Sequence, residues 1–317
     1  MRKGVFPEAQ MGQLMVQSFF SRDSSPPSHL VFTDLDGTLL DHQTYKWKEA
    51  LPALDLCREN GVPVILVSSK TRAEMDVLRR ELHLSSPFVS ENGGGVFFPR
   101  ETFRDAPSGA LPAKALGRNT SEELWEWSLG ISYSHLIRAL HDIRKVLDWP
   151  IRGFSEMDVS EIARLTGLDE TSARLAAMRE YDEPFIFDGE TPKDLKPLHD
   201  ESAARGLTVV SGGRFYHLLG NNHKGNAMMR IASLYNRQYP STEGHPSHIP
   251  TIALGDSPND FSMLLRADFP ILIRSKRDFP GLEKEIPKLR ITRSKGPKGW
   301  NKAILNILRK SKEKADA

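Results

Sequence analysis

Short apolar runs alternate with amphipathic stretches along most of the chain after His29. Residues 30–32 and 62–67 are almost continuously apolar, which is typical of strands buried on both faces of a sheet. The stretches 47–61 and 71–84 place apolar residues every three or four positions, which predicts helices with one buried face. The alternation returns after residue 223. This order predicts a parallel sheet with helices on both faces, that is, an α/β fold with a doubly wound core.

The pattern differs in the middle of the chain. Residues 98–218 lack a regular strand–helix alternation and predict an α+β domain inserted into the sheet domain. We expect helices at 134–148 and, as a pair, within 158–178, and strands at 183–189 and 206–220. The expected division is an N-terminal extension at 1–28, a core formed by 29–97 and 219–317, and the inserted domain at 98–218.

Composition narrows the class of protein. The 317 residues carry a formal net charge of +2, which does not suggest a nucleic-acid or membrane binder. Cys57 is the single cysteine, so no internal disulfide can form, and we expect it to act as a small buried apolar residue. The expected protein is cytoplasmic and either a monomer or a homodimer. Residues 11–20 have two open interpretations, a short amphipathic helix or a poorly ordered tail.

Polar side chains follow three of the predicted strands. Ligands bind outside the carboxyl ends of the strands in an open parallel sheet, so we expect these side chains to converge. Acidic oxygens from two strands suit a hard cation such as Mg²⁺, and no cluster of cysteine and histidine suggests zinc. The strand-end residues are Asp34, Asp36, Ser68, Ser69, Lys70, Asp256, Ser257, Asn259 and Asp260.

Two of these acids, Asp34 and Asp36, lie one residue apart, and such close like charges repel. A bound cation would offset the repulsion and shield a phosphate from an attacking carboxylate. One acid would then be a nucleophile and the other a general acid and base. Gly37 would allow a sharp turn, Ser68 would donate to a phosphate oxygen, and Lys224 would add positive charge at a helix N-terminus.

Each of these residues alone also has an ordinary structural explanation. An acid or serine after a strand is usually a turn residue or a helix cap, and a lone lysine is usually solvated. His245 and His248 lie in a polar loop without companion ligands, so we expect them to be solvated surface residues. The specific signal is the order of the set: "DLDGT", a strand ending in Ser68, Lys224-Gly225 and "GDSPND".

This ordered set resembles the haloacid dehalogenase-like (HAD-like) phosphatases, and the insertion resembles the α+β cap of their Cof-type (C2B-type) subgroup. The resemblance implies that Asp34 is the nucleophile and Asp36 the general acid and base. It also implies that Asp34, the backbone carbonyl of Asp36 and Asp256 hold Mg²⁺. Asn259 and Asp260 would support that site, with Ser68 and Lys224 completing the catalytic set. The acid at position 36 is typical of phosphatases and mutases, and P-type ATPases lack it.

A finer resemblance covers residues 30–305. The segments "VSSKTRAEM", "PFVSENGGGVFFP", "REYDEPF", "GGRFYHL" and "GPKGWNKAI" are similar to the mannosyl-3-phosphoglycerate phosphatases. The resemblance implies hydrolysis of mannosyl-3-phosphoglycerate to mannosylglycerate and phosphate, with a phosphorylated sugar-glycerate as the small-molecule partner. Residues 1–29 and the loop 237–250 fall outside it or depart from it.

The chemistry of such a substrate selects further candidates. Arginines suit carboxylate or phosphate, an acid suits sugar hydroxyls, and glycines allow close backbone approach. For Arg179 or Glu183 alone, a surface ion pair is an equally good explanation, and for Gly212–Arg214 a plain hairpin is a weaker one. The candidate substrate-binding residues are Ser69, Lys70, Asn92, Gly93, Arg179, Glu183, Gly212, Gly213 and Arg214.

Several alternatives share these motifs. The same chemistry could act on glucosyl-3-phosphoglycerate, on a broader set of sugar phosphates, or as a phosphomannomutase-like transfer. A catalytically inactive sugar-phosphate-binding regulator belongs to a different class, and the complete motif set argues against it. Nucleic-acid binding would rest on the basic segments 274–279 and 309–317, which are short and interrupted by acids.

Overall fold

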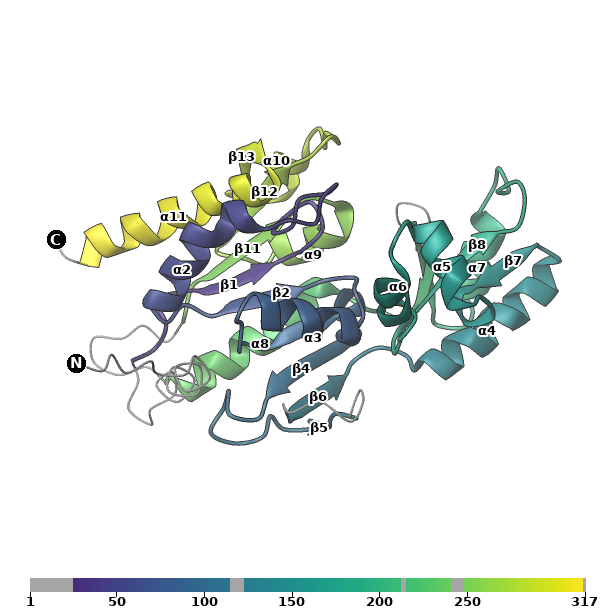
Figure 1. Ribbon diagram of the computed structural model, residues 1–317, viewed down its shortest axis with the longest axis horizontal. Coiled ribbons are helices and arrows are strands. Elements are labelled where there is room, and N and C mark those ends of the chain that lie inside the picture. Colours follow the sequence, from purple (N-terminus) through teal and green to yellow (C-terminus); the bar gives the residue numbers. More distant parts are fainter. Residues whose placement is uncertain (1–24, 115–122, 212–214, 241–247, 316–317) are drawn as a thin grey trace, which may run out of the picture.

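The computed structural model describes residues 25–114, 123–211, 215–240 and 248–315, called the described residues below. Nine strands form one large sheet in the order β13-β12-β11-β1-β2-β3-β4-β6-β5. Four more strands form a second sheet in the order β7-β8-β10-β9, which lies to one side of the first (Figure 1). The prediction of an α/β core with a parallel sheet and an inserted α+β region is confirmed.

The centre of the large sheet is parallel and buried on both faces. All four residues of β1 are buried, with Val31 packing against one layer of helices and Phe32 against the other. Helices α2 and α11 cover the first face, and α8 covers the second. The parallel strands are β1 (Leu30–Thr33), β2 (Val64–Val67), β3 (Phe88–Ser90), β11 (Thr251–Gly255), β12 (Phe269–Arg274) and β13 (Arg290–Lys295).

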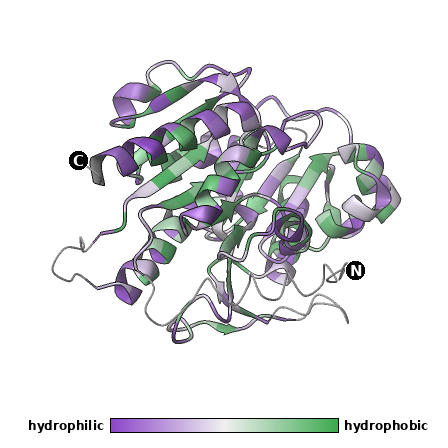
Figure 2. Ribbon diagram, turned by 60° about the vertical axis from the view of Figure 1, so that its left-hand side comes forward, coloured by the Kyte–Doolittle hydropathy of each residue, from purple (hydrophilic) through white to green (hydrophobic). Residues whose placement is uncertain are grey.

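The helices around the large sheet have one apolar face each, as the spacing of their apolar residues predicted. Figure 2 shows these helices with alternating hydrophilic and hydrophobic colours. Thr71 and Glu74 close a capping box that fixes the start of α3 directly after β2. Cys57 is buried and unpaired in α2, as expected. The helices are η1 (Lys48–Ala50), α2 (Leu51–Glu59), α3 (Arg72–Glu81), η2 (Glu91–Gly93), α8 (Lys224–Gln238), η4 (Pro258–Asp260), α9 (Phe261–Leu264), α10 (Leu282–Glu285) and α11 (Gly296–Ala315).

The second sheet is antiparallel, and its helices pack on one face. Strands β7 (Ile151–Gly153), β8 (Asp182–Phe187), β9 (Thr208–Ser211) and β10 (Tyr216–Leu219) carry alternate residues against α4 (Tyr133–Leu147) and α7 (Lys196–Ala203). The remaining elements are η3 (Phe154–Glu156), α5 (Val159–Thr166) and α6 (Glu170–Ala176). Asp158 and Asp169 cap α5 and α6, which confirms the predicted pair of short helices.

The sheets divide the chain differently from the predicted domain boundary. Residue 98 falls inside β4 (Gly95–Pro99), and β6 (Leu124–Ser128) and β5 (Leu111–Pro112) extend the large sheet in antiparallel fashion. Sheet membership would therefore move the start of the insertion to between β6 and β7. Strand β13 and helix α7 had no counterpart in the sequence prediction. The helix suggested at 11–20 lies outside the described residues, as do residues 241–247 of the loop 237–250.

None of the helices within the described ranges combines the length and apolar character that crossing a bilayer requires. The division into core and cap remains a prediction. The four-stranded sheet with its helices is the structural unit that we call the cap below.

Candidate active site

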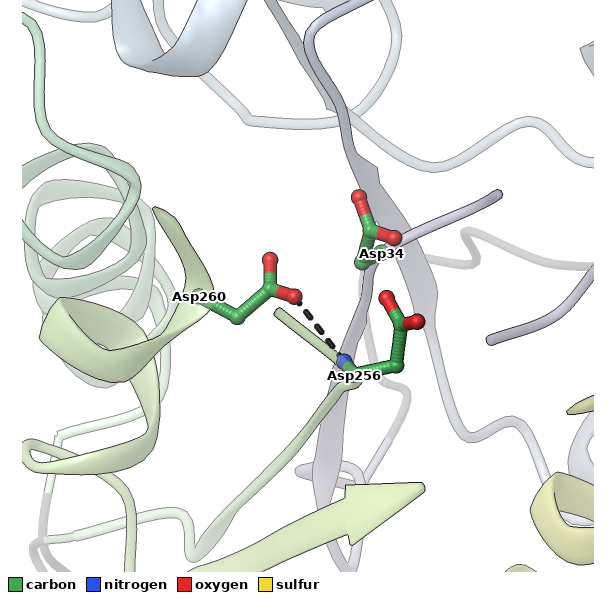
Figure 3. Close-up of side chains that lie close together, drawn as sticks. All are labelled: Asp34, Asp256 and Asp260. Atoms are coloured by element: carbon green, nitrogen blue, oxygen red, sulfur yellow. Dashed lines mark hydrogen bonds between the residues drawn. The ribbon is translucent and has the colours of Figure 1, made fainter. Parts of the chain in front are cut away.

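Three carboxylates meet at the carboxyl ends of β1 and β11. Asp34 follows β1 directly, and its backbone N–H donates to the Leu254 carbonyl of β11 at 2.9 Å. Asp256 and Asp260 follow β11. Each of the three acids has an oxygen within 4.8 Å of the other two, and Figure 3 shows the side chains side by side. Within the described residues, no other group of three or more acidic, histidine or cysteine side chains lies this close.

Lys224 provides the counter-charge. It is the first residue of α8, and its Nζ donates to Oδ1 of Asp34 and to Oδ1 of Asp260, each at 2.7 Å. The ammonium is fully buried. Burial alone would lower the pKa of Lys224, but the carboxylates of Asp260 and Asp34 outweigh it and hold the group charged.

The three acids repel one another despite this lysine. Burial raises the pKa of Asp34 to about 8, the Asp260 carboxylate adds to the rise, and Lys224 opposes it. Burial and Asp260 also raise the pKa of Asp256 to about 7. When all three acids are ionised, the cluster holds more negative charge than its one ammonium balances. Its ligands are all oxygen atoms, so the cluster fits a hard divalent cation.

Asp260 shapes the loop that carries Asp256. Its Oδ2 accepts from the backbone N–H groups of Asp256 at 3.0 Å and Ser257 at 3.1 Å, the first of which is dashed in Figure 3. The neighbouring Asn259 donates from Nδ2 to Asn92 Oδ1 at 3.1 Å, which ties this loop to η2. These contacts agree with the supporting role that the resemblance implies for Asn259 and Asp260.

The loop after β1 turns at Gly37, whose φ is +82°. A Cβ atom there would lie 2.6 Å from Asp256 Oδ2, so the turn lets the two acidic loops come into contact. Asp36 is not part of the three-acid cluster and pairs with a different lysine. Its Oδ2 lies 3.1 Å from Lys70 Nζ, which is itself 3.6 Å from Glu74 Oε1.

The strand-end residues after β2 and β3 lie beside this loop. Ser68 is buried, and its Oγ accepts from the Lys70 N–H at 3.2 Å. Ser69 and Asn92 line the main cavity, and Asn92 has a left-handed φ of 58°. Gly93 does not line the cavity. With φ +103°, its missing Cβ would lie 2.7 Å from the backbone oxygen of His223, so it permits close packing of η2 on the start of α8.

A cavity of about 1180 Å³ separates the carboxyl edge of the large sheet from the cap. Asp36, Asn92, Lys224, Asp256 and Asn259 line it from the core, while strands β9 and β10 line it from the cap. Asp34, only 6% exposed, lies beside this cavity through its contact with Lys224. The structure thus brings the predicted strand-end residues together around one cavity.

Two predicted substrate-binding residues of the cap lie elsewhere. Glu183 shares its face of β8 with Phe185, which packs toward α4, and it accepts from Ser155 Oγ at 2.7 Å. Arg179 donates to the Ser69 carbonyl at 3.0 Å and lies 3.5 Å from Asp182, so it joins the cap to the core. Neither lines the cavity, and this arrangement does not support direct substrate contact for either.

The remaining residues named from the sequence are either not described by the structure or lie at the surface. Gly212, Gly213, Arg214 and His245 lie outside the described residues. His248 is exposed at the surface and contacts Asp268 at 2.9 Å, which agrees with the expectation of a solvated residue. Five further residues line the cavity without having been predicted from the sequence: His217, Arg274, Lys276, Arg277 and Lys295. The alternation of the strand at 216–219 could have indicated His217, and the basic run 274–277 could have indicated Arg274, Lys276 and Arg277.

Comparison with known proteins agrees with this geometry. A haloacid dehalogenase-like hydrolase family model matches residues 31–107. A glucosyl-3-phosphoglycerate/mannosyl-3-phosphoglycerate phosphatase of Methanococcoides burtonii is 38% identical over 291 residues, covering 89% of this chain and 98% of that protein. A protein of Persephonella marina with the same name is 36% identical and covers 88% and 97%.

Solved structures share the fold at low sequence identity. A Thermoplasma acidophilum protein has a TM-score of 0.57 at 18% identity, covering 89% of this chain and 96% of its own. The sucrose-phosphatase of Synechocystis sp. PCC6803 has a TM-score of 0.54 at 12% identity, covering 88% and 97%. At these identities the likeness concerns the fold alone.

The chain thus belongs to the haloacid dehalogenase-like hydrolases, as the order of its motifs indicated. Within that class it belongs to the family of glucosyl-3-phosphoglycerate/mannosyl-3-phosphoglycerate phosphatases, and it is a phosphoric monoester hydrolase.

Proposed function

We propose that this enzyme is a Mg²⁺-dependent phosphatase that hydrolyses mannosyl-3-phosphoglycerate to mannosylglycerate and phosphate through a phosphorylated Asp34. The observation that carries the proposal is the buried cluster of Asp34, Asp256, Asp260 and Lys224 beside a cavity shared with the cap. The names of the relatives support the substrate class and include the glucosyl compound as a second candidate.

The metal would be held by the side chains of Asp34 and Asp256 and by the backbone carbonyl of Asp36. When bound, Mg²⁺ supplies positive charge that offsets the charges of the carboxylates and the phosphoryl oxygens. Asp260 and Asn259 would keep the Asp256 loop in place through the hydrogen bonds described above.

Asp34 would attack phosphorus with one carboxylate oxygen, forming an acyl phosphate and breaking the bond to the glycerate oxygen. Asp36 would give a proton to that leaving oxygen, and then take one from the water that attacks the acyl phosphate. This division suits the two carboxyl groups, because Asp34 pairs with Lys224 and Asp36 pairs with Lys70. Ser68 and Lys224 would stabilise the phosphoryl oxygens.

A panel of substrates tests this proposal. Phosphate release would be measured with and without Mg²⁺ for mannosyl- and glucosyl-3-phosphoglycerate, mannose 6-phosphate and 3-phosphoglycerate. We expect the glycosylated glycerates to give the highest kcat/KM, with Asp34→Asn inactive and folded. Asp55→Asn, which changes an exposed acid of α2, is the matched control.

Other outcomes identify the alternatives. Equal turnover of all esters would indicate a broader sugar phosphatase. Phosphate retained on sugar and a need for a bisphosphate activator would indicate a mutase-like transfer. Binding without turnover would indicate a regulator. Among these, the named relatives and the complete catalytic set favour the glycosyl-3-phosphoglycerate phosphatase.

A further inference from the structure

One face of the cap sheet forms a wall of the cavity. Strands β9 and β10 pair so that His217 lies opposite Val210 and Leu219 opposite Thr208, and all four line the cavity. Successive residues of a strand point to opposite faces, so Leu218 instead packs in the hydrophobic core with α4. His217 is therefore a cavity-facing imidazole beside Thr208, Val210 and Leu219.

A buried acid fixes the orientation of this imidazole. Asp182 is fully buried in β8, where it pairs with Leu219 and lies diagonally across from His217. The Nδ1 atom of His217 lies 2.8 Å from one Asp182 oxygen and 3.1 Å from the other. Since a carboxylate only accepts, Nδ1 carries the hydrogen in this pair. Arg179, at 3.5 Å, supplies Asp182 with a positive neighbour.

The second ring nitrogen is left for a ligand. The described residues offer no hydrogen-bond partner to Nε2, and the side chain of His217 retains 16% exposure on the cavity. With Nδ1 protonated, Nε2 of the neutral ring is an acceptor for a hydroxyl group.

We propose that His217 is a specificity-determining residue that accepts a hydrogen bond from a sugar hydroxyl of the substrate, with Asp182 as its positioning residue. This inference rests on the proposed function. It places the sugar of the proposed substrate at the cap wall of the cavity and the glycerate at the core wall. Val210, which lies opposite His217, exposes apolar surface that suits the C–H face of a sugar ring. Arg274, Lys276, Arg277 and Lys295 line the core wall, which suits the glycerate carboxylate instead.

The test compares two substitutions at one position. His217→Asn keeps a donor near Asp182 but removes the atom at the Nε2 position, whereas the longer amide of His217→Gln reaches that position. We expect His217→Asn to lower kcat/KM for the glycosylated glycerates by about fivefold to tenfold, mainly through KM, the size of one lost hydrogen bond. His217→Gln should recover part of the loss, and 3-phosphoglycerate turnover should fall by less than about twofold, because that ester has no sugar hydroxyl to lose.

Two further variants test whether Asp182 acts by positioning His217 or only by stabilising the fold. Asp182→Asn should raise KM for the glycosylated substrates, and adding it to His217→Asn should cause little additional loss, because Asp182 acts through the imidazole. His199→Gln, an exposed histidine of α7, is the control that should alter no substrate.

Several results would overturn the inference. Equal losses for 3-phosphoglycerate would place His217 on the glycerate, and equal losses for p-nitrophenyl phosphate would make its role structural. If the wild-type protein hydrolyses p-nitrophenyl phosphate but no glycosylated glycerate, the proposed function fails independently. The His217 variants are then compared on the sugar phosphates that the enzyme does accept, and an unaltered KM for all of them would exclude the sugar contact.

Discussion

Lys224 and Asp34 form a buried ion pair, with 2.7 Å between Nζ and Oδ1, although 190 residues separate them in sequence. Buried ion pairs are rarely a net gain in stability, because both charges lose their hydration. This pair is retained beside two further acids, Asp256 and Asp260, which add repulsion. We infer that the arrangement serves phosphoryl chemistry more than folding.

Replacing Lys224 with methionine should impair both activity and stability. The two carboxylates that it bonds would remain buried without a counter-charge, which costs on the order of 3–5 kcal/mol of unfolding free energy. Urea unfolding would measure the loss. Lys196→Met, which removes an exposed ion pair with Asp200, should leave the midpoint nearly unchanged. A Lys224→Met variant as stable as that control would show that the buried pair is not needed for folding.

The metal-free protein should lose stability as the pH rises from about 3.8 to about 8. The pKa of Asp34 is raised to about 8 and that of Asp256 to about 7, from an ordinary value of 3.8, so the folded state favours their protonated forms. Their contribution is therefore fully present below about pH 3.8 and is lost as the pH rises through the folded values. Thermal unfolding in EDTA across this range would show the effect, and Asp256→Asn should reduce it.

The affinity for Mg²⁺ should rise with pH, whereas the stability of the metal-free protein falls. Only deprotonated carboxylates bind the ion, so the affinity should rise from pH 6 to pH 8.5, with protons released on binding. Calorimetry in buffers of different ionisation enthalpy measures both quantities. Binding that is independent of pH and releases no protons would show that Asp34 and Asp256 are already ionised in the metal-free protein.

Replacing Lys70 should lower activity through the loss of its contact with Asp36. Its ammonium lies 3.1 Å from Asp36 Oδ2, and losing that contact would leave the proposed proton donor poorly placed. We expect Lys70→Met to slow hydrolysis of an alkyl phosphate by about tenfold or more, and p-nitrophenyl phosphate, whose leaving group needs little protonation, by much less. Lys70→Arg should retain more activity. Equal losses for both esters would remove Asp36 from the explanation.

Replacing Gly93 should lower the stability of the fold. An added Cβ would lie 2.7 Å from the His223 backbone oxygen, and the φ of +103° is unfavourable for other residues. We expect Gly93→Ala to lower the unfolding free energy by about 2 kcal/mol more than Gly109→Ala. Gly109 also has a positive φ, but its Cβ would contact nothing within 4 Å. Similar losses for the two variants would show that the loop simply moves aside.

The sequence predicted the core better than the cap. Apolar runs and strand-end polar residues located Asp34, Asp36, Asp256 and Asp260, because the carboxyl ends of parallel strands meet at one edge. The antiparallel extension through β6 and the edge strand β5 was missed, because neither strand alternates buried and exposed residues.

The wall of the cavity formed by the cap depends on strand alternation. Glu183 and Asp182 are adjacent in β8, yet one faces the hydrophobic core of the cap and the other supports the cavity-facing His217. Unless the pairing of β8, β9 and β10 is known, the sequence does not indicate which alternate residues of each strand face the ligand. The same limit applies to Arg179, whose contacts with Ser69 and Asp182 join segments far apart in the chain.

Trapping the phosphorylated enzyme tests the central claim most directly. Wild-type and Asp34→Asn protein would each be mixed with Mg²⁺ and with mannosyl- or glucosyl-3-phosphoglycerate that is radiolabelled in its phosphate, quenched in acid during turnover, and digested. The account predicts hydroxylamine-sensitive label on the peptide that contains Asp34, and none in Asp34→Asn. Label on another peptide, or wild-type turnover without any label in either protein, would contradict it.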